Sequence, residues 1–306
     1  MSKVILIIGA SSGFGRLTAE ALALSGHTVY ASMRDTKGRN AVQAKKIAAF
    51  SHKHDVNLRA IELDVLSQTS VDRAVAKILA ATGRIDVLIH DAGHRGFGPT
   101  VTFTPQQLSE PYEAYVLGTQ RVNRAVLPLM CWQKQGLMIW ISSGNSAGDV
   151  PPHLESCFAA KAGMDAMAVL YARELSQWGI ETSIIVPADE ERVGECKAGP
   201  YARFGEQGQK NAFATILPPD AGALPVADAI VDVVDMPFGE RPFWVHIDPT
   251  EDEANLGFTL RNRPRSEILR RVGLSDFFKP IQVFVNGLKT GRPWKAPRHA
   301  GSATLQ

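Results

Sequence analysis

Short apolar runs alternate with amphipathic segments along most of the chain. An unbroken apolar run of about five residues is typical of a buried strand, and apolar positions three or four residues apart are typical of one face of a helix. The runs predict strands at Val4–Ile8, Thr28–Met33, Leu58–Leu63, Val87–Asp91, Leu137–Ile141 and Thr182–Val186, with an edge strand at Phe243–Ile247. The periodic segments predict helices at Arg16–Ser25, Arg39–Lys53, Ser67–Thr82, Pro105–Met130, Phe158–Trp178 and Val226–Val234.

Strands that are apolar throughout and alternate with helices form a parallel sheet with both faces covered. We therefore expect an α/β fold, a doubly wound parallel sheet in a single domain. In such sheets ligands bind beyond the carboxyl ends of the strands. Those ends are Gly9, Arg34, Asp64, Asp91, Ser142 and Pro187.

A glycine-rich turn joins the first predicted strand to the first predicted helix. It reads Gly9-Ala10-Ser11-Ser12-Gly13-Phe14-Gly15. Gly9 permits a tight turn, Gly13 lets the backbone approach a pyrophosphate, and Gly15 allows close helix packing. The free N–H groups at the helix start would face the anion. The spacing G-x-x-x-G-x-G differs from the commoner G-x-G-x-x-G, so the turn alone also fits a structural role without a ligand.

Composition places the chain among ordinary globular proteins. Of its 306 residues 45% are hydrophobic and 21% are charged, and the formal net charge is +2. No basic block stands out, so we expect no nucleic-acid partner. The first apolar run is too short for a signal peptide or a membrane span, and a cytoplasmic location is expected. Cys131, Cys157 and Cys196 lack metal-ligand spacing, which favours reduced thiols and no metal site.

The character of the chain changes after Thr250. We expect a folded domain over residues 1–250 and a C-terminal extension over residues 251–306, partly helical and partly flexible. An arginine-rich segment, Arg261–Arg271, fits a solvated face or a partner contact, and Glu267–Val272 within it has a helical pattern. The tail Gly287–Gln306 is rich in Gly, Pro and Lys and is expected to be loosely ordered.

Several motifs follow one another as they do in one known family. They are the glycine turn, Leu63-Asp64-Val65, Asp91-Ala92-Gly93, Gly118-Thr119, Ser142-Ser143 and Lys161. On these residues the chain resembles the short-chain dehydrogenase/reductase family from Lys3 to Pro249. The resemblance implies a Rossmann-type sheet of strand order 3-2-1-4-5-6-7. It also implies a small-molecule substrate, and a homodimer or homotetramer formed through the helix that carries Lys161.

The residue after the second strand indicates the type of nucleotide. An acidic residue there would bind a ribose 2′-hydroxyl, whereas an arginine accommodates a 2′-phosphate. Arg34 stands at this position and offers a planar fork for a phosphate, so NADP(H) is expected despite the adjacent Asp35. A surface arginine without this role is the alternative. The resemblance adds as nucleotide contacts Gly9, Ser11, Ser12, Gly13, Phe14, Gly15, Asp64, Val65, Ala92, Gly93, Lys161 and Pro187, with the adenine against Asp64 and Val65.

This chain differs from reductases of the family at their catalytic residues. Those reductases use an Asn, a Ser and a Tyr-x-x-x-Lys pair, in which the tyrosine is the acid or base and the lysine lowers its pKa and holds the ribose. Here the pair reads Cys157-Phe-Ala-Ala-Lys161, the asparagine position is Tyr115, and the serine position is Gly144, with Ser142, Ser143 and Ser146 nearby. The usual Asn-Ala-Gly and Pro-Gly read Asp91-Ala92-Gly93 and Pro187-Ala188.

Five residues are candidates for chemistry at this site: Lys161, Tyr115, Cys157, Asp91 and Ser143. Cys157 is either a small residue that fills space or a thiol activated by Lys161. Asp91 is an acid or base beside the nicotinamide, or a cap of the next segment. We hypothesise that Tyr115 leans into the space left at position 157 and either closes the pocket or presents a relocated phenol, with core packing as the alternative.

Three functions stay open. The leading interpretation is a non-redox small-molecule enzyme (an isomerase, cyclase, dehydratase or lyase) that holds NADP(H) as a structural element, because the changes are concentrated in the pocket. The alternatives are an NADPH-dependent carbonyl reductase or alcohol dehydrogenase with an aberrant proton donor, and a catalytically silent NADP-binding subunit. A fold cannot choose among them, since sites determine function.

Overall fold

The computed structural model describes residues 2–92, 103–142, 155–187 and 224–247, and three short strands between residues 283 and 293. The strands are β1 (Val4–Ile8), β2 (Thr28–Met33), β3 (Leu58–Glu62), β4 (Val87–His90), β5 (Gly136–Ile141), β6 (Ile180–Pro187), β7 (Trp244–Ile247), β8 (Val283–Val285), β9 (Leu288–Lys289) and β10 (Arg292–Pro293). The helices are α1 (Gly13–Leu24), α2 (Ala41–His54), α3 (Gln68–Thr82), α4 (Pro105–Tyr112), α5 (Gly118–Gln133), α6 (Glu155–Leu175) and α8 (Leu224–Asp235), with the π-helical turn η2 (Glu113–Leu117) and the 3₁₀ turn η4 (Ser176–Trp178). The predicted helix at residues 267–272 lies outside the described residues.

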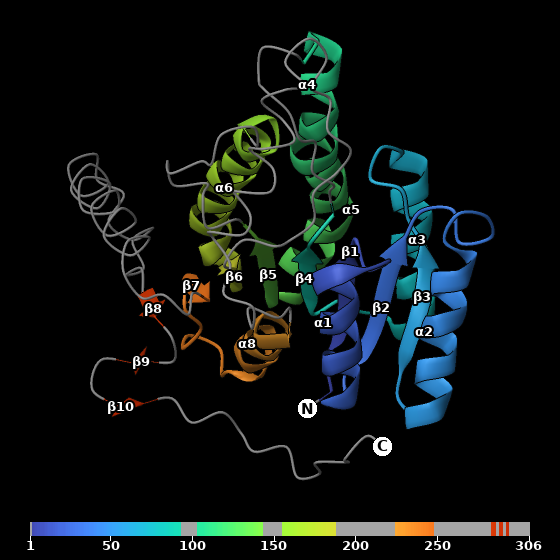
Figure 1. The fold of residues 1–306 in the computed structure, drawn as a ribbon. Helices are drawn as coiled ribbons and strands as arrows, with labels where there is room; N and C mark the ends of the chain where they lie inside the picture. Colours follow the sequence, from blue (N-terminus) through green and yellow to red (C-terminus); the bar gives the residue numbers. More distant parts are fainter. Residues whose placement is uncertain are drawn as a thin grey trace.

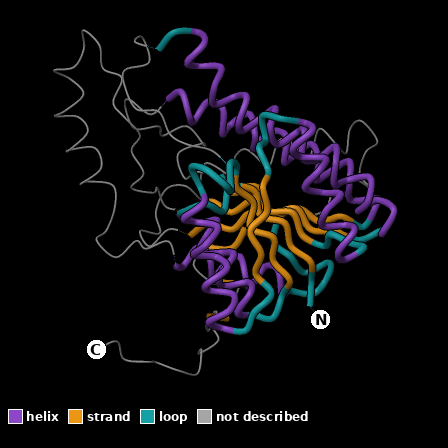
Figure 2. The backbone as a smooth tube through the Cα atoms, turned by 90° about the vertical axis from the view of Figure 1, so that its right-hand side faces the viewer, coloured by secondary structure: helices purple, strands orange, loops and turns teal. Residues whose placement is uncertain are grey.

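Seven parallel strands form the sheet in the order β3-β2-β1-β4-β5-β6-β7, which confirms the predicted order and fold class. Helices cover both faces of the sheet (Figures 1 and 2). The sheet continues from β7 through β8, which is parallel, to β9 and β10, which are antiparallel. The tail expected to be loosely ordered therefore contains two short strands.

The apolar character of the strands follows from burial on two faces. In β1 all five residues are buried. Leu6 and Ile8 belong to the core shared with α3, α5 and α6, whereas Ile5 and Ile7 belong to the core shared with α1, α2 and α8. Within the described segments, none of the helices combines the length and the apolar character needed to cross a membrane.

The predicted helix Pro105–Met130 is confirmed, but a π-helical turn, η2, divides it into α4 and α5. α4 begins with a capping box at Thr104 and contains Pro111, whose missing N–H removes a hydrogen bond from the helix just before the wider turn η2. α5 then starts at Gly118, where a Cβ atom would lie 2.9 Å from the Cβ atom of Val65. A glycine at this point lets the helix approach the end of β3 closely.

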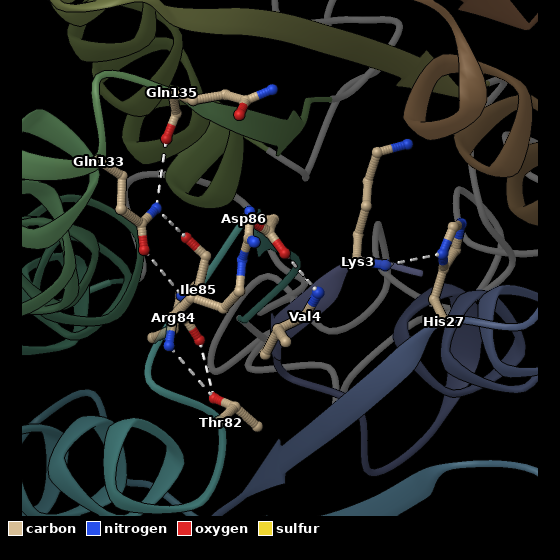
Figure 3. A network of polar contacts seen from close by, with 9 residues as sticks. All are labelled: Lys3, Val4, His27, Thr82, Arg84, Ile85, Asp86, Gln133 and Gln135. Atoms are coloured by element: carbon tan, nitrogen blue, oxygen red, sulfur yellow. Dashed lines mark hydrogen bonds and ion pairs between the residues drawn. The ribbon is translucent and has the colours of Figure 1, made fainter. Parts of the chain in front are cut away.

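Polar contacts tie together the amino-terminal edge of the sheet (Figure 3). The N–H of Val4 donates to Asp86 Oδ2 at 2.8 Å, and the N–H of Lys3 donates to His27 Nδ1 at 3.3 Å. Because Nδ1 of His27 accepts, its Nε2–H donates to Asp235 Oδ1 at 3.0 Å. Burial lowers the pKa of His27. These contacts connect β1 with β2, β4 and α8 at the edge opposite the carboxyl ends of the strands.

Candidate nucleotide and active site

The glycine turn after β1 packs tightly against the end of β4. Gly9 has a φ of +93°, and a Cβ atom on it would lie 2.5 Å from the backbone oxygen of Asp91 and 2.7 Å from the nitrogen of Ala92. A Cβ atom on Gly15 would lie 2.7 Å from Oδ2 of Asp91. No other residue fits these two positions without a shift of the backbone or of the Asp91 carboxylate. Two of the three predicted glycine roles therefore have a geometric basis.

Helix α1 starts within the turn, earlier than the predicted Arg16. Its N-cap is Ser12, and its first backbone hydrogen bond runs from Arg16 N–H to the carbonyl of Ser12 at 3.3 Å. The side chain of Phe14 is buried in the core below α1, so only its backbone lies in the turn. Ser11, Ser12 and Gly13 are half-buried at the helix start. An α-helix N-terminus with this geometry is suited to an anion.

The carboxyl ends of the strands meet at one edge, as the sequence predicts. Four backbone hydrogen bonds link neighbouring ends: Ala10 N–H to Ser32 O, Leu63 N–H to Met33 O, Asp91 N–H to Ile8 O, and Ser142 N–H to Ile185 O. Gly9, Arg34, Asp64, Asp91, Ser142 and Pro187 accordingly lie along the same edge of the sheet.

In the loop after β2, the carboxylate of Asp35 is bound within its own turn and not presented to a ribose 2′-hydroxyl. Asp35 has a φ of +49°, and its carboxylate accepts from the N–H of Gly38 at 3.0 Å and the N–H of Arg39 at 2.7 Å. Asn40 Nδ2 donates to the carbonyl of Arg34 at 2.6 Å. The carboxylate is thus used inside its own turn, while the side chain of Arg34 is exposed at the strand end.

The segment after β3 is held between two helices. Asp64 Oδ1 accepts from the N–H of Leu66 at 3.0 Å, and the N–H of Asp64 donates to Ser70 Oγ at 3.0 Å. The carbonyl of Val65 accepts from Arg121 at 3.2 Å. Asp64 and Val65 therefore have a fixed backbone, and their predicted adenine contact stays a prediction.

Lys161 and Tyr115 come together at the end of β5. The Lys161 Nζ atom donates to the carbonyl oxygen of Ile141 at 2.5 Å and lies 4.7 Å from the centroid of the Tyr115 ring. Tyr115 is only 4% exposed. An ammonium group at this distance from an aromatic face is a cation–π contact. Tyr115 also belongs to the apolar core shared with α3, α5 and α6, as the core-packing alternative expects, and its entry into the space at position 157 stays a prediction.

A buried polar group below the site is not evident from the sequence. His90, the last residue of β4, is 2% exposed, and its Nε2–H lies 2.8 Å from Asn123 Oδ1 on α5. Its ring is 4.7 Å from that of Trp140. Burial lowers the pKa of His90 to about 4, the contact with Asn123 opposes this, and the charge of Lys161 adds to it. His90 is therefore neutral near pH 7 and donates through Nε2.

The hydroxyl group of Ser142 points to α6. Its hydroxyl donates to Asp165 Oδ2 at 2.5 Å, and both side chains are buried. Asp165 lies one helical turn after Lys161 on α6, and a polar residue on the buried face of that helix was the only signal in the sequence. The contact joins α6 to the end of β5.

Several residues that the sequence predicts at the site, or in the C-terminal extension, lie outside the part of the chain that the structure describes. They are Gly93, Ser143, Gly144, Ser146, Ala188 and the C-terminal arginine segment. Cys157 lies on α6, but its side chain is not among those described. Their roles stay predictions. Within the described residues, no group of His, Cys, Asp and Glu side chains is arranged to hold a metal ion.

Comparison with known proteins gives consistent results. The family model for short chain dehydrogenases matches residues 3–190. A 3-ketodihydrosphingosine reductase of Bacteroides thetaiotaomicron is 30% identical over 61% of this chain and 64% of its own length. The 3-oxoacyl-(acyl-carrier-protein) reductase FabG of Escherichia coli is 26% identical over 72% of this chain and 92% of its own length.

Solved structures resemble the model in fold. A short-chain dehydrogenase of Streptomyces avermitilis superposes with a TM-score of 0.70 at 26% identity, covering 89% of this chain and 98% of the other. A metagenomic short-chain oxidoreductase in complex with NADP superposes with a TM-score of 0.64 at 21% identity, covering 82% of this chain and 98% of the other. Because the family model spans more than half of the chain and the sheet has the matching order, the protein belongs to the short-chain dehydrogenase/reductase family.

Proposed function

We propose that the protein is an NADP(H)-dependent oxidoreductase that acts on a small carbonyl compound or alcohol. Similar proteins are named as reductases, dehydrogenases or oxidoreductases, and similar structures were solved with NADP or with 5-hydroxy-NADP. The non-redox interpretation draws no support from them.

The loop after β2 is the observation that carries the nucleotide part of the proposal. The Asp35 carboxylate accepts two backbone N–H groups of its own turn, which leaves Arg34, Lys37 and Arg39 as exposed cations around the strand end. An arginine fork recognises a phosphate through paired, charge-assisted hydrogen bonds. A 2′-phosphate is the feature that separates NADP(H) from NAD(H).

The glycine turn fits the rest of the nucleotide. Side chains at Gly9 and Gly15 would collide with the residues after β4, and the first N–H groups of α1 are at the strand edge. These N–H groups would hold the pyrophosphate. Lys161, with its ammonium at the end of β5, would donate to ribose hydroxyls. NADPH, when bound, supplies the hydride for reduction of a carbonyl.

A titration with NADPH and NADH tests the nucleotide part. We expect wild type to bind NADPH more tightly than NADH, as measured by the change in nucleotide fluorescence. Arg34→Gln should weaken NADPH binding by about tenfold or more, because a charge-assisted contact is worth about 1.5–3 kcal/mol, and should leave NADH binding unchanged. Arg73→Gln, an exposed arginine on α3, is the control and should change neither. Equal loss of both nucleotides would contradict the assigned role of Arg34.

Turnover tests the redox part. NADPH consumption is measured at 340 nm against a panel of aliphatic and aromatic aldehydes and ketones, and NADP⁺ reduction against the matching alcohols. Turnover of at least one compound is expected. Tight NADPH binding without turnover of any compound would reject the oxidoreductase and favour the silent or the non-redox alternative.

A further inference from the structure

Reduction of a carbonyl leaves a negative charge on oxygen that a nearby acid must neutralise. We propose that the phenol of Tyr115, held against the ammonium of Lys161, is the proton donor and acceptor of this site. The inference rests on the proposed oxidoreductase function and adds to it a residue from the η2 turn. The position on α6 that precedes Lys161 by four residues carries Cys157 instead of a phenol.

The contact between the two residues brings together the groups needed for acid–base work. Nζ of Lys161 lies 4.7 Å from the centre of the Tyr115 ring and is held there by its bond to the carbonyl of Ile141. A positive charge beside a phenol stabilises the phenolate that remains after the proton leaves. Tyr115 is only 4% exposed. Burial by itself disfavours a phenolate, but the exclusion of water also strengthens its attraction to the ammonium.

The local fold explains how Tyr115 reaches this position. It lies in the middle of η2, a turn with π-helical hydrogen bonding, and such turns change the direction of side chains relative to a regular α-helix. η2 and α4 pack against α6, and Figure 1 shows α4 and α6 as neighbours. At the contact, a Cβ atom on Gly163 would lie 3.3 Å from Cγ2 of Val116, so the glycine on α6 permits the close approach.

Other polar residues described at the strand ends are already committed elsewhere. The carboxylate of Asp91 lies against Gly15 at the first turn of α1, on the side of the nucleotide turn. The hydroxyl of Ser142 donates to Asp165. His90 is buried and neutral, with its Nε2–H on Asn123. Tyr115 differs from them in having the ammonium of Lys161 against its ring.

The step assigned to Tyr115 is a proton transfer. In reduction, the proton of its Oη passes to the substrate oxygen as the carbon receives the hydride, so that the carbonyl becomes an alcohol. The phenolate left behind is neutralised by a proton from water, and Lys161 stays protonated. In oxidation of an alcohol the same proton moves in the opposite direction.

Removal of one hydroxyl group tests the step. Tyr115→Phe keeps the ring and its contact with Lys161 but lacks the transferable proton. With the aldehyde or ketone that wild type reduces fastest, we expect kcat to fall by at least about a hundredfold, the usual contribution of a general acid, and NADPH binding to change less than about threefold. Tyr171→Phe is the matched control, because Tyr171 is a partly buried tyrosine on the same face of the sheet whose hydroxyl donates to Gln120. It should keep full kcat.

A spectroscopic measurement tests the location of Tyr115 without turnover. The chain has five tyrosines, so incorporation of 3-fluorotyrosine gives five ¹⁹F signals, and the signal absent from Tyr115→Phe is that of Tyr115. We expect this signal to move when NADPH is added and when Lys161 is replaced by Met. The signal of Tyr171 should not move with NADPH.

The outcomes separate the inference from the function on which it rests. No turnover by wild type rejects the oxidoreductase and the inference with it. Turnover that Tyr115→Phe retains, or a Tyr115 signal that NADPH does not move, rejects the inference and leaves the oxidoreductase standing. Loss of kcat in Cys157→Ala with full kcat in Tyr115→Phe would transfer the donor role to Cys157.

Discussion

Acidification should destabilise the protein because protonation of His90 is unfavourable in the folded state. We expect this effect at a higher pH than protonation of the carboxylates of the protein. In the folded chain His90 is buried between β4 and α5, with its Nε2–H on Asn123, and its pKa is lowered to about 4, mainly by burial. In the unfolded chain the imidazole regains its ordinary pKa of 6.5. Between pH 6.5 and pH 4 the imidazole of His90 is therefore protonated in the unfolded state and neutral in the folded state.

The sign and size of the effect follow from this difference. Stability from the neutral His90 is fully present above pH 6.5 and is lost as the pH falls to about 4. One pKa unit corresponds to 1.36 kcal/mol, so the total loss is about 3 kcal/mol. That is a large share of the ~5–15 kcal/mol by which domains are usually stable. His27, whose pKa burial also lowers, adds a loss of the same sign.

Urea unfolding followed by circular dichroism at several pH values measures the effect. The comparison is with His90→Gln, which does not titrate and whose Nε2–H₂ can still donate to Asn123. Between pH 6 and pH 4.5 we expect the free energy of unfolding to fall by about 2 kcal/mol more in wild type than in the variant. His52→Gln, at an exposed position of α2, should follow wild type. Parallel curves for wild type and His90→Gln would refute the reasoning.

Two further predictions concern stability alone, each measured by urea unfolding. Gly9 and Gly26 both have positive φ values, +93° and +88°, but a Cβ atom on Gly26 meets nothing within 4 Å. Gly26→Ala should cost about 1–2 kcal/mol for its backbone conformation, and Gly9→Ala clearly more because its methyl group collides with backbone; equal costs would contradict the close packing of the turn. Glu181 and Arg241 form an ion pair whose side chains are only 9% and 8% exposed. Glu181→Gln, which leaves a buried guanidinium uncompensated, should cost roughly 3–5 kcal/mol, whereas Glu20→Gln, in a more exposed pair on α1, should cost less than about 1 kcal/mol.

Local patterns were sufficient for the order of elements and for the position of the nucleotide turn. Strands buried on both faces are largely apolar, so strands such as β1, β4 and β5 are visible as apolar runs in the sequence. β3, at the end of the sheet, has exposed polar positions between its buried ones. A turn that approaches a neighbouring strand end needs glycines whatever packs around it, and Gly9 and Gly15 mark it. The prediction for Arg34 used only its place after β2. The start of α1 was missed by three residues, since the helix already begins at Gly13, inside the glycine-rich turn.

The sequence by itself therefore determined the fold, its family and the edge of the sheet at which a nucleotide is expected, because these depend on periodicity and on short motifs. Only the tertiary structure decided which polar groups meet. The turn of Asp35 into its own loop, the bond of Ser142 to Asp165, the burial of His90 against Asn123 and the contact of Tyr115 with Lys161 are decided by packing. Most of them join residues more than 20 positions apart, on strands and helices whose relative rotation no local pattern encodes. Tyr115 itself lies in the π-helical turn η2, which follows Pro111 within this helical stretch.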